Sequence, residues 1–435
     1  MRTRPTWFVA AAMALPLFAQ AASQPAAKPA VASTAEPLVV LKTSHPMFGP
    51  MLADGLGITD PLPDLANDGH YAFTMDAERR FAVVLGKGDV PVIEVQARPG
   101  ALMEAFAEPI EGGRAYVQTA LSVVLQQLGL TGKEAVLWTR AVWDFPRQVS
   151  VVTIQVTGDI EDPRLGGLDV ALDLVPLEGS PFARFLTALA PCAAGVPVLP
   201  GRSLLDAQVS LAPASLLALC EPLLEASAAL AFQTPELRQQ AAKLQREALG
   251  HYDGGMALGI GGEPLAGRLL AGLLDGAAYG KFVASEAYRA LMSQQKLANR
   301  NQELQIAFGA EQHRGLAFDR AVVRGEDEDE PLVGGLATSL MGAAGKYLVG
   351  ALGGGGNLTK NTTALADAAL DDRVKRAPLA EGVLLRMALD LPGLLPHLEK
   401  FGLEVPPEAA DEMPGELVLT LGKAKGALRL ALHIQ

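Results

Sequence analysis

A recurring alternation of hydrophobic and polar positions organises most of the chain. In five stretches the side chains alternate with a period of two, a proline or glycine interrupts the pattern, and a leucine-rich helical pattern follows. Proline ends a strand because it has no N–H group, and its fixed φ suits the first turn of a helix. Each stretch therefore predicts a strand with one buried face and a helix that packs back on it. The five stretches are residues 92–106, 168–186, 205–224, 255–274 and 383–398.

Alternating runs on either side of short turns predict hairpins between these stretches. The paired runs are 70–75 with 80–85, 134–144 with 148–157, 302–308 with 315–323, and 416–421 with 427–434. Hairpins interleaved with helices predict an α+β fold, in which helices cover one face of a curved, mainly antiparallel sheet. The degenerate repeat indicates a duplicated, two-part molecule. A helical stretch over 235–249 ends at Gly250, so we expect domains at 38–250 and 251–435.

The first residues have the pattern of an export signal. Arg2 and Arg4 precede an apolar run over 7–18, and residues 19–21 offer the small side chains at which a signal peptidase cuts. The run is too short to span a bilayer comfortably and contains no cysteine for lipidation. We therefore expect residues 1–21 to be removed and residues 22–37 to form a flexible lead-in. The mature protein is expected to be soluble in the periplasm or secreted, and not a lipoprotein.

Composition and charge narrow the class of partner. The net charge is −12, and removal of Arg2 and Arg4 makes it more negative. A negative chain without a basic block argues against a nucleic-acid partner. Hydrophobic residues make up 49% of the chain but aromatic residues only 5%, so the cores must be built from leucine, valine and alanine.

The two cysteines are Cys192 and Cys220. Disulfides persist in compartments outside the cytoplasm, so export predicts a bond between these cysteines. The alternative is a pair of buried thiols that act as small apolar residues.

An acidic run and an apolar segment stand out in the second half of the chain. Residues 325–331 predict a solvated loop, and residues 333–356 are apolar with Lys346 as their only charge. Within this segment a stripe of leucines recurs at multiples of four residues and predicts one apolar helix face; its members are Leu336, Leu340, Leu348 and Leu352. Burial in the core, a mobile lid over an apolar groove, and contact with a membrane surface are the three alternatives. The glycines weaken a helix and favour the lid, while the single cation disfavours the membrane.

No sequence motif carries metal or cofactor chemistry, and we expect no cofactor. The six histidines lack the spacing of a zinc motif, and the Gly-Lys pairs are never followed by Ser or Thr as in a phosphate loop. Asp60, Asp64 and Asp68 lack the alternate-position pattern of a calcium loop and predict a solvated turn. Ser293 and Lys296 form a Ser-x-x-Lys pair, in which an amine could activate a hydroxyl, but the supporting Ser-Asp-Asn and Lys-Thr-Gly motifs are absent.

These observations favour a non-enzymatic, exported binding or interaction protein, with an apolar groove for a hydrophobic small molecule, a lipid or a peptide. One alternative is a hydrolase that uses Ser293 and Lys296. Another is a structural protein of the envelope that touches the membrane through residues 333–356.

Overall fold

The computed structural model describes residues 36–58, 62, 64–65, 69–78, 80–88, 90–127, 143–158, 167–232, 234–262, 265–294, 303–324, 338–353, 356–400 and 415–434. These residues form two compact units. Unit 1 contains the described residues up to Arg114 together with Phe145–Ser180, and unit 2 contains the described residues of Ala115–Asp144 and of Pro181–Gln435. Helix α4 (Ala107–Gln127) carries the chain from unit 1 into unit 2.

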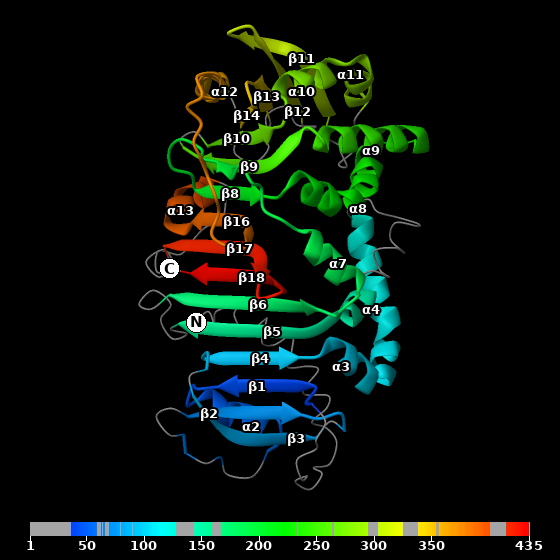
Figure 1. The fold of residues 1–435 in the computed structure, drawn as a ribbon, viewed down its shortest axis with the longest axis vertical. Helices are drawn as coiled ribbons and strands as arrows, with labels where there is room; N and C mark the ends of the chain where they lie inside the picture. The colour runs from blue at the N-terminus through cyan, green and yellow to red at the C-terminus, as the bar shows by residue number, and fades with distance from the viewer. Residues whose placement is uncertain are drawn as a thin grey trace. The chain divides into compact units, whose positions relative to one another are not determined.

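Unit 1 is built on an antiparallel sheet with the strand order β6-β5-β4-β1-β2-β3 (Figure 1). The strands are β1 (Val39–Thr43), β2 (Gly69–Met75), β3 (Phe81–Lys87), β4 (Ile93–Ala97), β5 (Val149–Gly158) and β6 (Leu168–Pro176). Its helices are α2 (Phe48–Gly55), α3 (Pro99–Ala105) and the 3-10 turn η1 (Phe145–Gln148).

The two faces of this sheet differ because the side chains alternate along each strand. On one face, Leu41 and Phe73 pack under α2, while Val39 and Val95 pack under α3. On the opposite face Lys42 lies opposite Glu94, and Glu94 lies opposite Gln155, so that a polar row crosses β1, β4 and β5. In unit 1, α2 and α3 therefore cover the same face of the sheet, as predicted.

Unit 2 contains a larger antiparallel sheet with the order β11-β12-β13-β14-β10-β9-β8-β16-β17-β18. Its strands are β8 (Leu205–Ser210), β9 (Tyr252–Gly261), β10 (Ala266–Leu273), β11 (Glu303–His313), β12 (Leu316–Arg324), β13 (Thr338–Ala344), β14 (Tyr347–Leu352), β16 (Val383–Asp390), β17 (Glu416–Ala424) and β18 (Ala427–Ile434). A short separate pair joins β7 (Val196–Pro197) to β15 (Arg376–Ala377).

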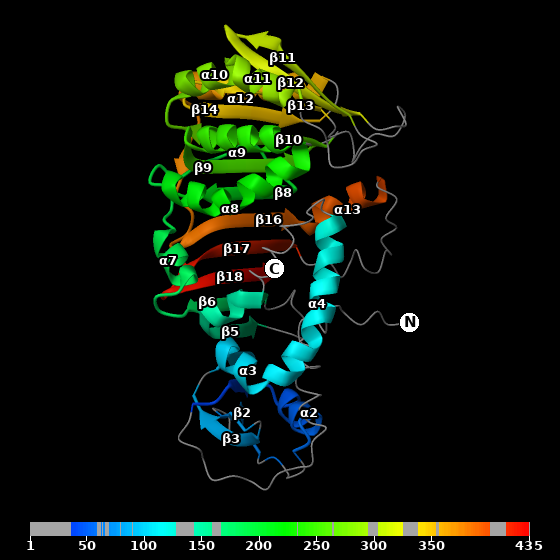
Figure 2. The same cartoon turned by 90° about the vertical axis from the view of Figure 1, so that its right-hand side faces the viewer.

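Helices cover both faces of the sheet in unit 2, so the expectation that helices cover one face is wrong for this unit, because β10 and β14 carry apolar side chains on both faces. They are α7 (Pro181–Ala188), α8 (Pro213–Ala231), α9 (Pro235–Leu249), α10 (Gly276–Ala284), α11 (Glu286–Met292), α12 (Gly356–Leu370) and α13 (Leu391–Lys400). Figure 2 shows α8 and α9 lying across β8 and β9. Tyr279 and Phe282 of α10 pack on Ala271 of β10. Leu365 of α12 packs on Leu270, the residue before Ala271 in the same strand. Because neighbouring residues of a strand point to opposite faces, α12 lies on the face opposite α10.

One topology recurs through both units: a strand, one or two helices, and a hairpin, with the three strands adjacent in chain order. The four copies are β1-α2-β2-β3, β4-α3-α4-β5-β6, β8-α8-α9-β9-β10 and β16-α13-β17-β18. In each unit the first strands of two copies pair antiparallel, with Leu41 opposite Val95 in unit 1 and Ala207 opposite Met387 in unit 2. The α+β class and the duplicated, two-part organisation are thus confirmed.

The strand–proline–helix pattern predicts four of the five stretches correctly, and the exception has a physical explanation. Residues 265–274 were expected to be helical but form β10, which pairs with β9 and β14. Two positions of this strand need glycine because a side chain would not fit. A Cβ on Gly267 would lie 2.8 Å from Leu352, and a Cβ on Gly272 would lie 2.2 Å from the Asp253 carboxylate. The same glycines would weaken a helix.

The predicted hairpins at 70–85, 302–323 and 416–434 are confirmed as β2–β3, β11–β12 and β17–β18. The predicted hairpin of 134–144 with 148–157 is wrong in its second arm, because β5 pairs with β4 on one side and β6 on the other. Residues 134–142 lie outside the described residues. Trp143 and Asp144 are helical.

The predicted domain boundary near Gly250 is also wrong. Helix α9 does end at Leu249, but β8 and β9 on either side of it pair in one sheet, with Ala207 opposite Leu258. The end of α9 was therefore interpreted as a linker between domains, although α8 and α9 connect two neighbouring strands of one sheet. The compact units divide at Arg114, Phe145 and Pro181 instead.

Candidate functional site

The candidate site lies beside α2 in unit 1, and a glycine brings this helix close to the sheet. A Cβ on Gly49 would lie 2.2 Å from Cδ2 of Tyr71, so a larger residue would force the helix away from β2. The preceding turn is held by two hydrogen bonds, from the His45 N–H to Thr43 Oγ1 at 3.1 Å and from the Met47 N–H to His45 Nδ1 at 3.3 Å. Tyr71 is 5% exposed and forms the floor beneath the helix.

The C-terminal end of α2 turns the chain back over the same floor. The Gly57 N–H donates to Asp54 O at 3.0 Å and the Ile58 N–H donates to Ala53 O at 2.9 Å, which is the Schellman pattern. Gly57 has a φ of +69°, a conformation that glycine adopts without strain. The motif directs Ile58 against Ala53 and Tyr71 in one apolar cluster.

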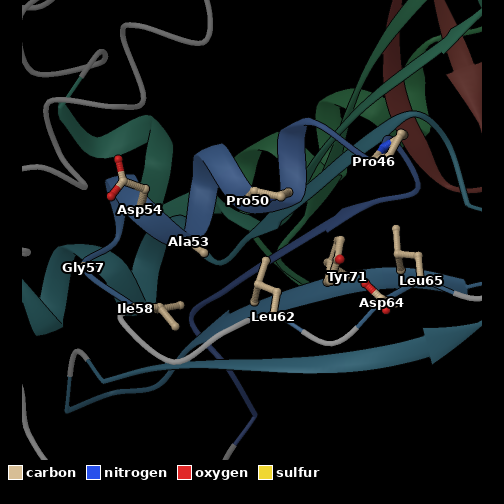
Figure 3. Close-up of a pocket in the computed structure, with 10 residues that line it drawn as sticks. All are labelled: Pro46, Pro50, Ala53, Asp54, Gly57, Ile58, Leu62, Asp64, Leu65 and Tyr71. Atoms are coloured by element: carbon tan, nitrogen blue, oxygen red, sulfur yellow. The ribbon is translucent and has the colours of Figure 1, made fainter.

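An open cleft of about 730 Å³ lies between α2, the segment that follows it and β2. Pro50 and Ala53 come from the helix, Ile58, Leu62 and Leu65 come from the following segment, and Tyr71 comes from β2 (Figure 3). Pro46 and Gly57 complete the apolar lining. Most of the lining residues are apolar, although the cleft is open to solvent and polar atoms contribute the larger part of its lining surface. Its volume is within the range of small-molecule sites.

Two carboxylates give the cleft its charge. Asp54 and Asp64 line it, and both are exposed. Neither side chain has an ion-pair or hydrogen-bond partner among the described residues. The arrangement can surround an apolar group and favours a neutral or cationic polar end over an anionic one. Among the same residues, no group of three side chains has the composition of a metal site.

Sequence reasoning missed this cleft, although a signal was present. Val39, Val40 and Leu41 form a short apolar run rich in strand-forming residues, and Pro46 and Pro50 then accompany a helix, so the stretch is a further strand–proline–helix element. Asp64 was interpreted as a solvated turn acid, and it is indeed exposed. Asp60 and Asp68 lie outside the described residues.

The predicted lid over 333–356 is wrong for the part that the structure describes. Residues 338–344 and 347–352 form the hairpin β13–β14, and Gly345 (φ +56°) and Lys346 make its turn. Leu340 packs under α12 on one face of the sheet, whereas Leu348 packs with α10 on the other. Leu352 is half-buried on the same face as Leu348, and Leu336 lies outside the described residues. The described leucines are therefore divided between two faces of a sheet and do not form one helical stripe.

The Ser-x-x-Lys pair also gains no support as a catalytic site. Ser293 is exposed at the end of α11, and its hydroxyl donates to the carbonyl oxygen of Arg289 at 2.8 Å. A hydrogen bond to the carbonyl four residues earlier is a local interaction that serine makes in helices without any catalytic role. Lys296 lies outside the described residues.

The predicted disulfide is not present, because Cys192 and Cys220 are both free thiols. Cys192 is buried, and its Sγ donates to the Asp253 carbonyl oxygen at 3.2 Å. Cys220 packs with the leucine-rich clusters around α8. Burial raises the pKa of both thiols above the ordinary value, which lowers the thiolate fraction and argues against a nucleophilic role.

Next to Cys192 lies an ion pair between Arg376 and Asp253. The guanidinium is bidentate, with Nη1–Oδ2 at 2.5 Å and Nη2–Oδ1 at 3.1 Å, and it also donates to the carbonyl of Gly195 at 2.7 Å. The Gly255 N–H donates to Asp253 Oδ1 at 2.9 Å. Since every polar group of the pair has a protein partner, we interpret the cluster as a clamp that joins β15, β9 and the segment after α7.

Comparisons with known proteins add no function. No protein-family profile matches the chain, and no curated protein matches it. Among solved structures, crystal form IV of TP0453 aligns with a TM-score of 0.28 at 10% identity, covering 57% of this chain and 82% of that chain. A similarity at this level supports no conclusion about a shared fold or function. No helix among the described residues has the length and apolar character needed to cross a membrane.

Proposed function

We propose that this chain is an exported binding protein that holds an apolar ligand in the cleft beside α2. The observation that carries the proposal is the cleft itself, about 730 Å³ in volume and lined by Pro50, Ala53, Ile58, Leu62 and Tyr71. Sites for small molecules and cofactors usually combine such a lining with a few polar groups. The export signal over residues 1–21 lies outside the described residues and supports the proposal from the sequence alone.

The ligand is a lipid-like amphiphile with a neutral or cationic end. Its apolar part would contact Ile58, Leu62 and Tyr71, which belong to one apolar cluster. Its polar end would face Asp54 or Asp64, because both carboxylates are exposed at the cleft. An anionic head group would meet like charge there, and the net charge of −12 would add to the repulsion.

The test is binding of a neutral fluorescent apolar probe, N-phenyl-1-naphthylamine, to the full mature chain. Leu62→Trp fills the cleft with a larger side chain and should weaken binding by about tenfold or more, which corresponds to about 1.4 kcal/mol. Leu274→Trp is the matched control, because Leu274 is 61% exposed in unit 2 and does not line the cleft. Both variants should retain the circular dichroism spectrum of the unchanged protein.

A second comparison addresses the carboxylates. Asp54→Asn with Asp64→Asn should reduce the preference for a cationic over an anionic amphiphile of equal chain length, while binding of the neutral probe stays nearly constant. Equal loss of probe binding in the Leu62→Trp and Leu274→Trp variants, or no saturable binding at all, would remove the proposed function.

A further inference from the structure

The outermost strand of unit 1 is an unprotected sheet edge. β3 pairs with β2 over seven positions, from Phe81 opposite Met75 to Lys87 opposite Gly69. Among the described residues no strand pairs with its other side, and Figure 1 shows β3 as the last strand of this sheet. The outer N–H and C=O groups of such a strand are available to another strand.

The side chains of β3 make this edge apolar on both faces. Val84 is 58% exposed and Leu85 is 44% exposed. Because neighbouring residues of a strand point to opposite faces, these two side chains extend the edge's apolar surface above and below the sheet. From Phe81 to Gly86 the strand contains no charge and no proline, and Lys87 is its only charged residue.

The edge strand of unit 2 provides an internal comparison. β11 is the last strand in that sheet, and its pairing with β12 is shifted between Ala307 and Glu311. Gly309 sits in this irregularity with a φ of +61°, and its N–H donates to Asp319 Oδ1 at 2.7 Å. Bulges and charges of this kind protect an edge from further pairing. β3 has no such irregularity in its pairing with β2, and its single charge, Lys87, lies at the end of the strand.

We propose that β3 pairs antiparallel with β3 of a second copy of this chain, which joins two unit 1 sheets across a two-fold axis. A register centred on Val84 places this residue opposite itself and Val83 opposite Leu85. In the same register Ala82 faces Gly86 and Phe81 faces Lys87, so that no two like charges oppose each other. The strand is thus complementary to itself, as a two-fold interface requires. A foreign strand would need its own matching apolar pattern.

The test uses charge at the centre of the register. Val84→Lys and Val84→Glu each place like charges opposite one another across the two-fold axis, and the exposed position leaves the fold of unit 1 intact. Sedimentation velocity on the full mature chain should show a dimer for the unchanged protein. Each variant alone should be monomeric, with a dissociation constant raised by at least about a hundredfold. An equimolar mixture should dimerise again, because lysine then faces glutamate.

Leu274→Lys and Leu274→Glu serve as matched controls on an exposed leucine outside β3 and should leave the dimer unchanged. A monomeric unchanged protein at every accessible concentration would overturn the proposal, as would a dimer that both Val84 variants leave intact. A monomer that binds an extended apolar peptide through β3 would also contradict the proposal, because the partner of β3 would then be a peptide and not a second copy. The apolar-probe experiment on Leu62→Trp is independent of all these outcomes, because Leu62 is not part of β3.

Discussion

His70 and Gly86 lie opposite each other in β2 and β3, and the imidazole occupies the space above the glycine. A Cβ on Gly86 would lie 2.1 Å from His70 Nε2. His70 is 7% exposed, so the ring cannot move into solvent without disturbing the strand pair. We expect Gly86→Ala to lower the free energy of unfolding by about 1–3 kcal/mol through overpacking.

Chemical denaturation measures this loss, and the His70→Ala background identifies its cause. The penalty of Gly86→Ala should shrink when the imidazole is absent. Gly55→Ala is the control, because a Cβ at Gly55 in α2 meets nothing within 4 Å. An equal penalty with and without His70 would mean that glycine is needed for another reason.

Glu94 is the carboxylate in the polar row that crosses β1, β4 and β5, and it is buried. It accepts hydrogen bonds from Lys42 Nζ at 2.8 Å, Gln155 Nε2 at 2.9 Å and Gln96 Nε2 at 3.1 Å. Burial alone would raise the pKa of Glu94, but the bonds from Lys42 and Gln155 and the charge of Lys42 outweigh it and lower the pKa below the ordinary 4.5. The ionised carboxylate therefore stabilises the fold at neutral pH.

Glu94→Gln should lower the free energy of unfolding by about 1.5–3 kcal/mol at pH 7, as for hydrogen bonds to charged groups. Because the folded pKa is lowered, this contribution is complete above pH 4.5 and disappears as the pH falls through the folded value. The difference between the two proteins in urea denaturation should therefore narrow on acidification. Glu104→Gln, at an exposed position, should show no such narrowing. A difference that is constant from pH 7 to pH 3 would contradict the assignment.

At the scale of elements, local chemistry made the strand–proline–helix units readable. β4, β8 and β16 each lead into a helix with proline in its first turn, and both signals lie within a few residues of each other. β13 and β14 were misread as a helix because leucines spaced at multiples of four residues fit one face of a helix and also one face of a strand, whose period is two. Only the turn at Gly345 shows that Leu340 and Leu348 belong to different strands.

The glycines of β13 distinguish the two interpretations experimentally. A Cβ on Gly342 would lie 2.7 Å from Cδ1 of Phe318, which is 1% exposed, and 2.8 Å from the carbonyl oxygen of Ala317. Gly342→Ala should therefore lower the free energy of unfolding by about 1–3 kcal/mol. In a mobile helix the same change would stabilise the protein, because alanine is the better helix former by about 0.5–1 kcal/mol.

Gly280→Ala is the matched comparison for urea denaturation. Gly280 lies inside α10, where a Cβ meets nothing within 4 Å, so this substitution should be neutral or stabilising. Gly342→Ala should thus lower the free energy of unfolding, whereas Gly280→Ala should leave it unchanged or raise it. A stabilising Gly342→Ala would show that this segment is not held as a strand in solution.

For the whole molecule, the sequence predicts the class of fold better than its division into units. The repeated pattern correctly indicated duplication, because each copy contains its own strand, helix and hairpin. The boundary was misplaced because pairing between first strands, such as Ala207 opposite Met387, joins segments that lie far apart in the chain. The cleft was missed for a related reason: Tyr71 and Pro50 line the same cleft only because α2 folds back on β2, and the spacing of residues in the sequence does not show this.

The two units have separate apolar cores, which predicts separate unfolding. The clusters of unit 1 contain Leu38, Val39, Met75, Ala53 and Phe73, whereas the cluster that contains Leu270 and Phe318 lies in unit 2. Units with their own cores can unfold as distinct cooperative transitions. We expect differential scanning calorimetry of the full chain to resolve two transitions. Gly86→Ala in unit 1 and Gly342→Ala in unit 2 should each lower the midpoint of a different one, by a few degrees. A single transition that both substitutions shift equally would show that the chain unfolds as one cooperative body.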